Sequence, residues 1–342
     1  MTRNKDMPNE PDSLCETDIP VIVVAGPTAS GKSAAALAIA REFNGVVINA
    51  DSMQLYKDLP LLTARPTAAE MGAVPHRLYG VLELGETCSA ARWRDMAIVE
   101  IEAARQAGRL PVLCGGSGLY IKALLEGLSP IPEIPAAVRQ AVRQAFEARG
   151  QAAMRAELLE KDPVMAARLE PADQQRTLRA LEVLAATGRS LAQWQAAPKS
   201  GPPPGLRFAT ILITPPRDVL YAACNERLLQ MVAQGVVEDV AAVFARITKA
   251  EEQGAGAGPS LRDALLLKAL GVPQFQAYNE GAMDLAAAIE KAQIATRRYA
   301  KRQMTWIRGN YISQIDINEK YSQKCNTKIF SFIRQKRLTL DN

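Results

Sequence analysis

The sequence predicts an α/β protein, a parallel sheet flanked by helices, with a helical insertion domain. Two observations carry this prediction. In the first 120 or so residues, short apolar runs typical of buried strands alternate with Ala- and Leu-rich segments typical of helices. Between residues 136 and 198 the composition stays helical, and no run typical of a strand occurs. Strands joined through helices indicate parallel pairing, because parallel neighbours need a crossover connection.

Three strands and two helices are predicted in the first part of the chain. The apolar runs at 21–25, 46–50 and 110–114 are predicted strands, because β-branched residues and Leu dominate them. Helices are predicted from Lys32 to Phe43 and from Asp95 to Ala107.

Two Pro-rich connectors divide the chain. One lies at 129–135 and the other, KSGPPPG, at 199–205, where the backbone is stiff. A strand that returns to the sheet is predicted at 208–213. The predicted parts are a disordered lead-in at 1–18, an α/β core at 19–135 plus 199–312 with C-terminal helices, a helical insertion domain at 136–198, and a tail without assigned structure at 313–342.

Composition narrows the class of protein. Apolar residues make up 48% of the 342, which is enough for a sizeable core, and no run of about 18 apolar residues predicts a membrane span. The polar, acid-containing first 18 residues do not resemble a secretion signal, and the five cysteines form no CxxC pair. We therefore expect a cytoplasmic protein. A net charge of +5 is compatible with nucleic-acid binding without establishing it.

A phosphate-binding loop follows the first strand. The segment GPTASGKS at 26–33 matches GxxxxGK[ST] and lies between a predicted strand and a predicted helix, which makes the core P-loop NTPase-like. Backbone N–H groups at the start of a helix attract a phosphate, Lys32 adds a positive charge, and the Ser33 hydroxyl can bind Mg²⁺. The motif predicts binding of a di- or triphosphate, ATP among them, without saying which.

An acid follows the second strand, whereas the third strand ends without one. A nucleotide-hydrolysing P-loop protein usually carries an acidic Mg²⁺ ligand at the end of a buried strand, but Cys114 is followed by two glycines. Asp51 lies at the same predicted sheet edge as the phosphate loop. A metal ligand, a general base and a helix N-cap all remain open for Asp51.

A basic stretch lies near the C-terminal end of the predicted core. Five Arg and Lys residues occur between 297 and 308, with Tyr299 and Trp306 among them. Such a helix can bind RNA phosphates or can simply be a solvated face with Trp306 in the core.

The motifs, taken in order, resemble the family of bacterial tRNA dimethylallyltransferases, also called tRNA isopentenyltransferases. The matching stretches are GPTASGKS (26–33), ADSMQLYKDL (50–59), TARPT (63–67), PHRLYG (75–80), GGSGLYIKALLEGLSP (115–130), DQQRTLRALEVLAATGRSL (173–191) and TRRYAKRQMTWIRGN (296–310). The phosphate loop by itself is a weak signal, but the ordered set is specific.

The resemblance implies transfer of the dimethylallyl group from dimethylallyl diphosphate to N6 of adenosine 37 in tRNAs that read codons starting with U. Asp51, Ser33 and Lys32 are implied as catalytic residues, with Asp51 as the base and Ser33 on Mg²⁺. The residues implied in diphosphate binding are Gly26, Pro27, Thr28, Ala29, Ser30, Gly31, Lys32, Ser33 and Arg227.

The resemblance also implies a monomer that binds the anticodon stem-loop, partly through the insertion domain. The residues implied in tRNA binding are Asp51, Ser52, Met53, Gln54, Ser117, Arg139, Gln175, Arg176, Thr177, Leu178 and Arg179. Two positions depart from the commoner family pattern. Arg65 stands where the family usually has Lys, and Ala223 stands where it usually has Arg, which leaves Arg227 as the candidate on that helix.

Two other functions compete with this one. The first is a small-molecule kinase, or a prenyltransferase acting on a free adenine nucleotide, for which free AMP or ATP would compete with tRNA. The second is a non-catalytic RNA-binding module switched by a nucleotide. The absence of a guanine-binding NKxD motif and of a second strand-end acid disfavours that switch.

Overall fold

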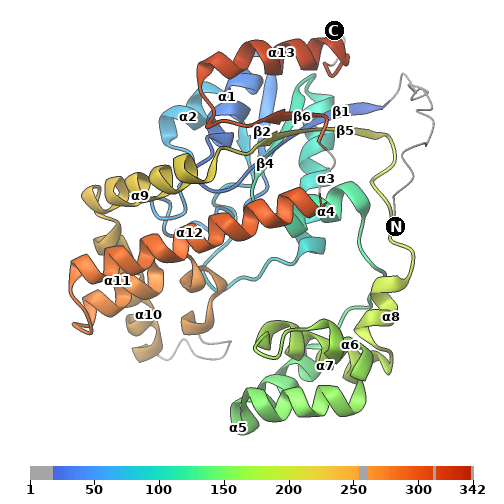
Figure 1. The fold of residues 1–342 in the computed structure, drawn as a ribbon, viewed down its shortest axis with the longest axis vertical. Coiled ribbons are helices and arrows are strands. Elements are labelled where there is room, and N and C mark those ends of the chain that lie inside the picture. Colours follow the sequence, from blue (N-terminus) through green and yellow to red (C-terminus); the bar gives the residue numbers. More distant parts are fainter. Residues whose placement is uncertain (1–17, 254–260, 311–312, 340–342) are drawn as a thin grey trace. The chain divides into compact units, whose positions relative to one another are not determined.

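The computed structural model describes residues 18–253, 261–310 and 313–339 (Figure 1). The lead-in predicted at 1–18 therefore lies, apart from Asp18, outside the described residues. The chain divides into two compact units, one formed by residues 1–125 with 203–342 and the other by residues 126–202. The insertion predicted at 136–198 falls within the second unit.

The first unit contains a six-stranded sheet in which every strand pair is parallel. In spatial order the strands are β3 (His76–Arg77), β2 (Gly45–Asn49), β4 (Leu110–Gly115), β1 (Ile19–Ala25), β5 (Leu206–Ile213) and β6 (Ile315–Ile317). In the register, Ile22 of β1 pairs with Val112 of β4 on one side and with Ala209 of β5 on the other. This sheet confirms the predicted fold class, and the three early strands and the return strand form at the predicted places.

The sheet is covered on both faces, so its strands are apolar throughout. On β1, Val21 and Val23 point into the core shared with α3 (Ala90–Gln106) and α4 (Gly118–Glu126). Ile22 and Val24 point into the opposite core. Helices α1 (Lys32–Glu42) and α13 (Asn326–Gln335) supply that second core, and Figure 1 shows them on the other side of the strands from α3 and α4.

Local capping fixes where two of these helices begin. The Ser89 side chain accepts a hydrogen bond from the Arg92 N–H, so α3 starts five residues before the predicted Asp95. Thr67 and Glu70 form a reciprocal capping box at the start of the short α2 (Ala68–Ala73). The segment between β2 and β3 is otherwise built from turns.

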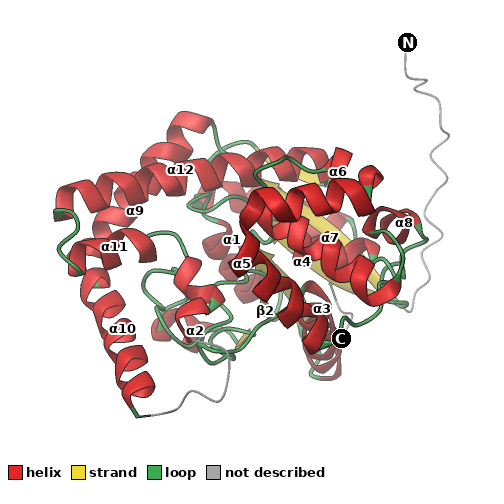
Figure 2. Cartoon of the chain, turned by 90° about the horizontal axis from the view of Figure 1, so that it is seen from below, coloured by secondary structure: helices red, strands yellow, loops and turns green. Residues whose placement is uncertain are grey.

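The C-terminal half of the first unit adds a layer of helices. These are α9 (Arg217–Ala233), α10 (Val236–Glu252), α11 (Val272–Asn279) and α12 (Leu285–Asn310), with two 3₁₀ turns at Leu261–Asp263 and Leu265–Lys268. Consecutive pairs pack together, and α12 also packs on α9, as Figures 1 and 2 show. Within the described residues no single helix has the length and apolar character to cross a membrane, and only the bent pair α9–α10 passes both criteria together.

The tail without assigned structure joins the core. Strand β6 extends the sheet beyond β5, pairing Ile315 with Ile211. A 3₁₀ turn at Gln323–Cys325 leads into α13, whose Ile329 and Ile333 are fully buried beside α1.

The second unit is helical and has its own apolar core. It consists of α5 (Ala136–Lys161), α6 (Pro163–Arg168), α7 (Gln174–Thr187) and α8 (Leu191–Ala196). Gly150, with φ 74° and ψ 175°, breaks α5 into two helical segments. Met154 and Leu158 of α5 pack with Leu181 of α7 in the core of this unit.

Candidate active site

Three loops meet at the carboxyl edge of the sheet in the first unit. The phosphate loop follows β1, Asp51 follows β2, and Gly116 with Ser117 follows β4. All three strands are parallel, so their carboxyl ends lie at one edge, where open α/β sheets bind ligands.

The phosphate loop has the backbone that its glycines permit. Gly31 is the N-cap of α1 with φ 92°, a left-handed conformation that glycine adopts without penalty. A Cβ on Gly26 would lie 2.7 Å from the Ile213 carbonyl oxygen, so a side chain does not fit there. Ser33, in the first turn of α1, is an exposed residue whose side chain also hydrogen-bonds with Cys114.

Lys32 is buried beneath this loop. Its ammonium group donates a hydrogen bond to the Pro27 carbonyl at 3.2 Å. Burial lowers the pKa of Lys32, and the negative charge of Asp51 partly offsets this effect by raising it. A positive charge held in a partly desolvated site attracts an anion more strongly than one in water.

The backbone of Asp51 is fixed by Asn49. The Asn49 side chain, fully buried, accepts from the Asp51 N–H at 2.8 Å and donates to the Asp51 carbonyl at 2.9 Å. It also donates to the Leu78 carbonyl at 2.9 Å, while the backbone carbonyl of Asn49 accepts from the Trp93 indole N–H at 2.9 Å. Asp51 therefore leaves the sheet in one defined orientation.

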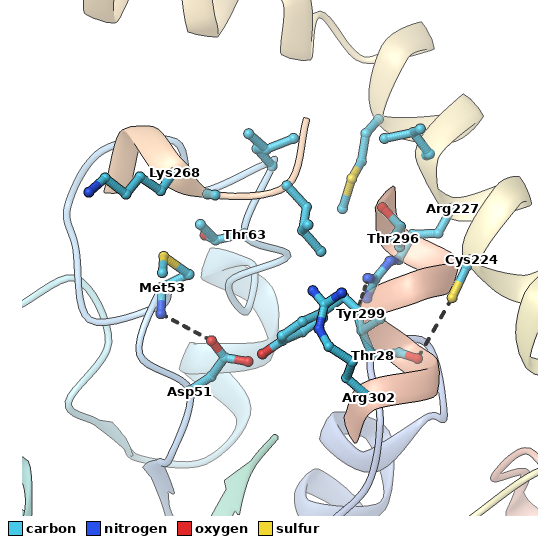
Figure 3. Close-up of a pocket in the computed structure, with 15 residues that line it drawn as sticks. Thr28, Asp51, Met53, Thr63, Cys224, Arg227, Lys268, Thr296, Tyr299 and Arg302 are labelled. Atoms are coloured by element: carbon cyan, nitrogen blue, oxygen red, sulfur yellow. Dashed lines mark hydrogen bonds between the residues drawn. The ribbon is translucent and has the colours of Figure 1, made fainter. Parts of the chain in front are cut away.

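The Asp51 side chain turns toward the open end of the site. One carboxylate oxygen accepts a hydrogen bond from the Met53 N–H at 3.1 Å, two residues on, which is an Asx turn. Residues 52–58, all described, contain only turns, bends and a single β-bridge, so Asp51 is not the N-cap of a helix. In Figure 3 the carboxylate and the hydroxyl end of Tyr299 point toward one another across the cavity.

The cavity over these residues has a volume of about 260 Å³ and two kinds of wall. Its polar wall contains Thr28, Asp51, Thr63, Arg227, Lys268, Thr296, Tyr299 and Arg302. Its apolar wall contains Met53, Leu62, Leu228, Met231, Ala269 and Leu270. One space thus offers cations and hydroxyls beside an apolar surface suited to a short hydrocarbon chain.

Helix α9 places a cation beside the loop. Arg227 donates a hydrogen bond to the Thr28 hydroxyl, and burial lowers the pKa of the guanidinium while Cys224 and Asp51 raise it. Ala223 is buried on α9 and is not among the described residues that line the cavity. Arg227, the candidate left on this helix, therefore faces the phosphate loop.

Arg65 lies elsewhere. It donates to the carbonyls of Tyr56 at 3.0 Å and Lys57 at 3.2 Å, and it lines a smaller cavity with Ser33 and Glu70. Its main contacts are thus to the turn that follows Asp51.

A family model described as IPP transferase matches residues 54–310, well over half of the chain. The chain belongs to the IPP transferase family. It is 52% identical over 289 residues to the tRNA dimethylallyltransferase of Rhodospirillum centenum, covering 84% of this chain and 88% of the relative. With that of Paramagnetospirillum magneticum it shares 48% identity over 326 residues, covering 95% and 99%. These matches confirm the resemblance drawn from the motifs.

A solved structure agrees with this membership. The full-length tRNA isopentenylpyrophosphate transferase from Bacillus halodurans superposes with a TM-score of 0.65 at 31% identity, covering 93% of this chain and 96% of that one. That enzyme therefore shares this fold over nearly the whole chain.

Among the residues that the family resemblance implies in tRNA binding, five lie in the first unit, and two of them, Asp51 and Met53, line the cavity. Ser52 donates its N–H to the Ser117 hydroxyl at 2.9 Å, and Met53 lines the apolar wall. Gln54 is buried, and its amide donates to the carbonyls of Thr63 at 2.9 Å and Ala64 at 3.0 Å. The amide of Gln54 therefore already has hydrogen-bond partners within the protein.

The remaining ones belong to the second unit. Arg139 on α5 and both Gln175 and Arg176 on α7 are exposed. Thr177 is fully buried and donates its hydroxyl to the Asp173 carbonyl at 2.8 Å. Leu178 is partly buried against the core of this unit, and Arg179 lies 3.4 Å from Glu182.

Helix α12 contributes site residues that the motifs did not assign to the cavity. Tyr299 and Arg302 belong to the basic stretch, yet they line the cavity together with Thr296. The spacing of residues 299 and 302, three apart on one helix, was the available signal that both share a face.

Proposed function

We propose that the protein transfers the dimethylallyl group from dimethylallyl diphosphate to N6 of adenosine 37 of tRNAs that read codons starting with U. The observation that carries this proposal is one cavity in which Thr28 of the phosphate loop, Asp51 and an apolar wall meet. The names of the relatives, which are tRNA dimethylallyltransferases, support the same reaction.

In this reaction the diphosphate lies against the phosphate loop. Lys32 and Arg227 supply positive charge where negative charge grows as the bond between the allylic carbon and oxygen breaks. The five-carbon chain packs on the apolar wall around Met53 and Met231. Water that is kept from this wall cannot intercept the reacting carbon.

Asp51 serves as the general base in this proposal. The N6 nitrogen forms a bond to the allylic carbon, inorganic pyrophosphate leaves, and the N6 proton passes to the Asp51 carboxylate. The amine of adenine is a poor nucleophile, so a fixed carboxylate beside it contributes directly. Since the target base must leave its stack to enter a cavity, the tRNA loop is expected to present adenosine 37 flipped out.

Mg²⁺ fits the residues present. Ser33 is an exposed residue at the start of α1, and Mg²⁺ is usually bound by oxygen ligands from one or two protein groups together with substrate phosphates and water. Within the described residues no group of three His, Cys, Asp or Glu side chains could hold a metal. When bound, the ion would neutralise charge on the leaving diphosphate.

The helical unit is proposed to contact the anticodon stem-loop. Arg139 and Arg176 are exposed there, and exposed arginines can neutralise RNA phosphates. This contact would raise the affinity for tRNA. A free nucleotide is too small to make the same contact.

A transfer assay tests the proposal. Purified protein, Mg²⁺, AMP and labelled dimethylallyl diphosphate are mixed in one reaction with unmodified tRNA carrying adenosines at 36–38, and in a second reaction with the same tRNA carrying guanosine at 37. Label on the first RNA only supports the proposal. Label on neither RNA, with labelled AMP formed instead, overturns it in favour of a free-nucleotide prenyltransferase.

A further inference from the structure

Gln303 of α12 bridges two loops of the active site. It is 6% exposed, and both ends of its amide bind backbone. Its carbonyl oxygen accepts from the N–H of Thr28 in the phosphate loop at 2.9 Å, and its NH₂ group donates to the Gly116 carbonyl at 3.0 Å. A buried amide with both ends engaged is held in one orientation, and so are the loops that it joins.

The bridge continues to Asp51. Gly116 is followed by Ser117, whose hydroxyl accepts from the Ser52 N–H at 2.9 Å and lies 3.3 Å from the Ser52 hydroxyl. The Ser117 N–H donates to the Ala50 carbonyl at 3.2 Å. Asp51 lies between residues 50 and 52, so hydrogen bonds connect it through Gln303 to the phosphate loop.

Space at the bridge is tight. A Cβ on Gly116 would lie 2.4 Å from the Gln303 amide nitrogen and 3.1 Å from the Gly26 carbonyl oxygen. Helix α12 and the two loops therefore approach as closely as glycine allows. A shorter or differently shaped side chain at position 303 would lose the hydrogen bonds to Thr28 and Gly116 that hold the helix and the two loops together.

Strand order shows why such a bridge matters. Strand β4 lies between β1 and β2, so the loops carrying the phosphate site and Asp51 start two strand spacings apart, about 10 Å. The leaving group and the proton acceptor must face one reacting carbon across that gap. Misplacement of reacting groups by about 1 Å can reduce a rate on the order of 10²-fold.

We infer that Gln303 is a positioning residue that sets the separation between the diphosphate and the Asp51 carboxylate. This inference rests on the proposed function, in which Asp51 is the base. Gln303 acts through Thr28 and Gly116 and not by contact with substrate, because both ends of its amide are already occupied.

The main test replaces Gln303 with Met, which keeps the length and removes both hydrogen bonds. Single-turnover transfer should slow on the order of 10²-fold. The Kd for inorganic pyrophosphate and the Kd for tRNA should stay within about threefold, since neither ligand loses a direct contact. Thr305→Ala, at an exposed position of the same helix, is the matched control and should transfer at the wild-type rate.

A second variant and a double-mutant cycle separate positioning from general loosening. Gln303→Glu keeps the acceptor for Thr28 and loses the donor to Gly116, so it should also slow transfer. This variant tests the inference independently if Gln303→Met folds poorly. In an Asp51→Ala background, Gln303→Met should cost less than about threefold, because the group it positions is gone.

Four results would count against these proposals. Full additivity of the two substitutions, or a loss of pyrophosphate affinity equal to the loss of rate, overturns the inference. A wild-type protein that transfers no label overturns the proposed function instead. Unchanged transfer in both Gln303 variants of an active enzyme overturns the inference while leaving that function in place.

Discussion

Arg227 and Thr28 are 199 residues apart in sequence, and the guanidinium of the first donates a hydrogen bond to the hydroxyl of the second. One turn earlier on α9, the Cys224 thiol lies 3.9 Å from the Thr28 carbonyl oxygen. One face of α9 thus closes the cavity directly over the phosphate loop, as Figure 3 shows.

Replacing Arg227 with Met should weaken diphosphate binding. Hydrogen bonds to charged groups contribute about 1.5–3 kcal/mol, which corresponds to a roughly 10- to 150-fold rise in Kd for dimethylallyl diphosphate. The Kd of Arg227→Lys should lie between that of Arg227→Met and that of the wild type, because lysine keeps the charge but lacks the planar guanidinium. Titration calorimetry with inorganic pyrophosphate measures the effect. Arg217→Met, the same change at an exposed position of α9, is the control, and equal losses in both variants would contradict the assigned contact.

Lys32→Met should stabilise the free protein and abolish its response to diphosphate. A buried ammonium costs free energy that a thioether of similar length does not, since burial lowers the pKa of Lys32. The midpoint of thermal unfolding should rise by an amount on the order of 2–4 °C for each kcal/mol gained. Inorganic pyrophosphate should raise the midpoint of the wild type only. A variant that still responds to pyrophosphate would show that Lys32 does not bind the anion.

The same lysine gives a pH dependence of defined sign. Its pKa in the folded protein lies below 10.5, so the unfolded chain holds the proton more tightly. At pH values below this lowered pKa, Lys32 is charged in the folded protein, and the free-energy cost of burying the ammonium is fully present. As pH rises from that value toward 10.5, the folded state releases its proton first, and wild-type stability increases relative to Lys32→Met. The difference in unfolding midpoint between the two proteins should therefore narrow toward pH 10, and a constant or widening difference would contradict the burial of a charged Lys32.

The strands and the phosphate loop could be predicted because their signals are local. The β-branched run at 21–25 is typical of a strand buried on both faces of a sheet. The GKS at 31–33 ends a phosphate-loop motif that lies between this strand and the next helix. Asp51 could be placed at the same edge because parallel strands end together. The part of the site contributed by α9 and α12 depends on packing between distant segments, which a single sequence does not encode as a pattern.

The tail shows the same limit. Strand β6 has only three residues, too few for an alternation of apolar and polar positions to stand out. Ile329 and Ile333, four residues apart and fully buried, were the available signal for α13. The role of this tail beside the phosphate loop depends on contacts that only the structure reveals.

Tyr321 in the tail should tune diphosphate affinity. Its N–H donates to the Ser30 carbonyl at 3.0 Å, and its Cβ lies 2.9 Å from where a Cβ on Gly31 would be, so it packs directly behind the loop. Tyr321→Gly should raise the KM for dimethylallyl diphosphate by roughly fivefold, or about 1 kcal/mol, and leave the KM for tRNA unchanged. Tyr321→Phe loses only the hydroxyl that donates to Asn326 and should behave like wild type. If both changes raised the KM equally, the effect would come from loss of the hydroxyl and not from loss of packing on the loop.

Asn49 should prove necessary for the orientation of Asp51 as well as for stability. Asn49→Leu leaves the Asp51 N–H and the carbonyls of Asp51 and Leu78 without their partner, and each buried unpaired group costs about 1–3 kcal/mol. Trp93→Phe provides the comparison, because it lowers stability through lost buried volume but removes only one hydrogen bond, from the indole N–H to the Asn49 backbone carbonyl. Both variants should unfold at lower temperature, whereas transfer measured well below those temperatures should slow markedly in Asn49→Leu alone. If the two variants lost activity in proportion to their lost stability, Asn49 would be a structural residue of the sheet edge, and the orientation of Asp51 would have to come from its Asx turn with Met53.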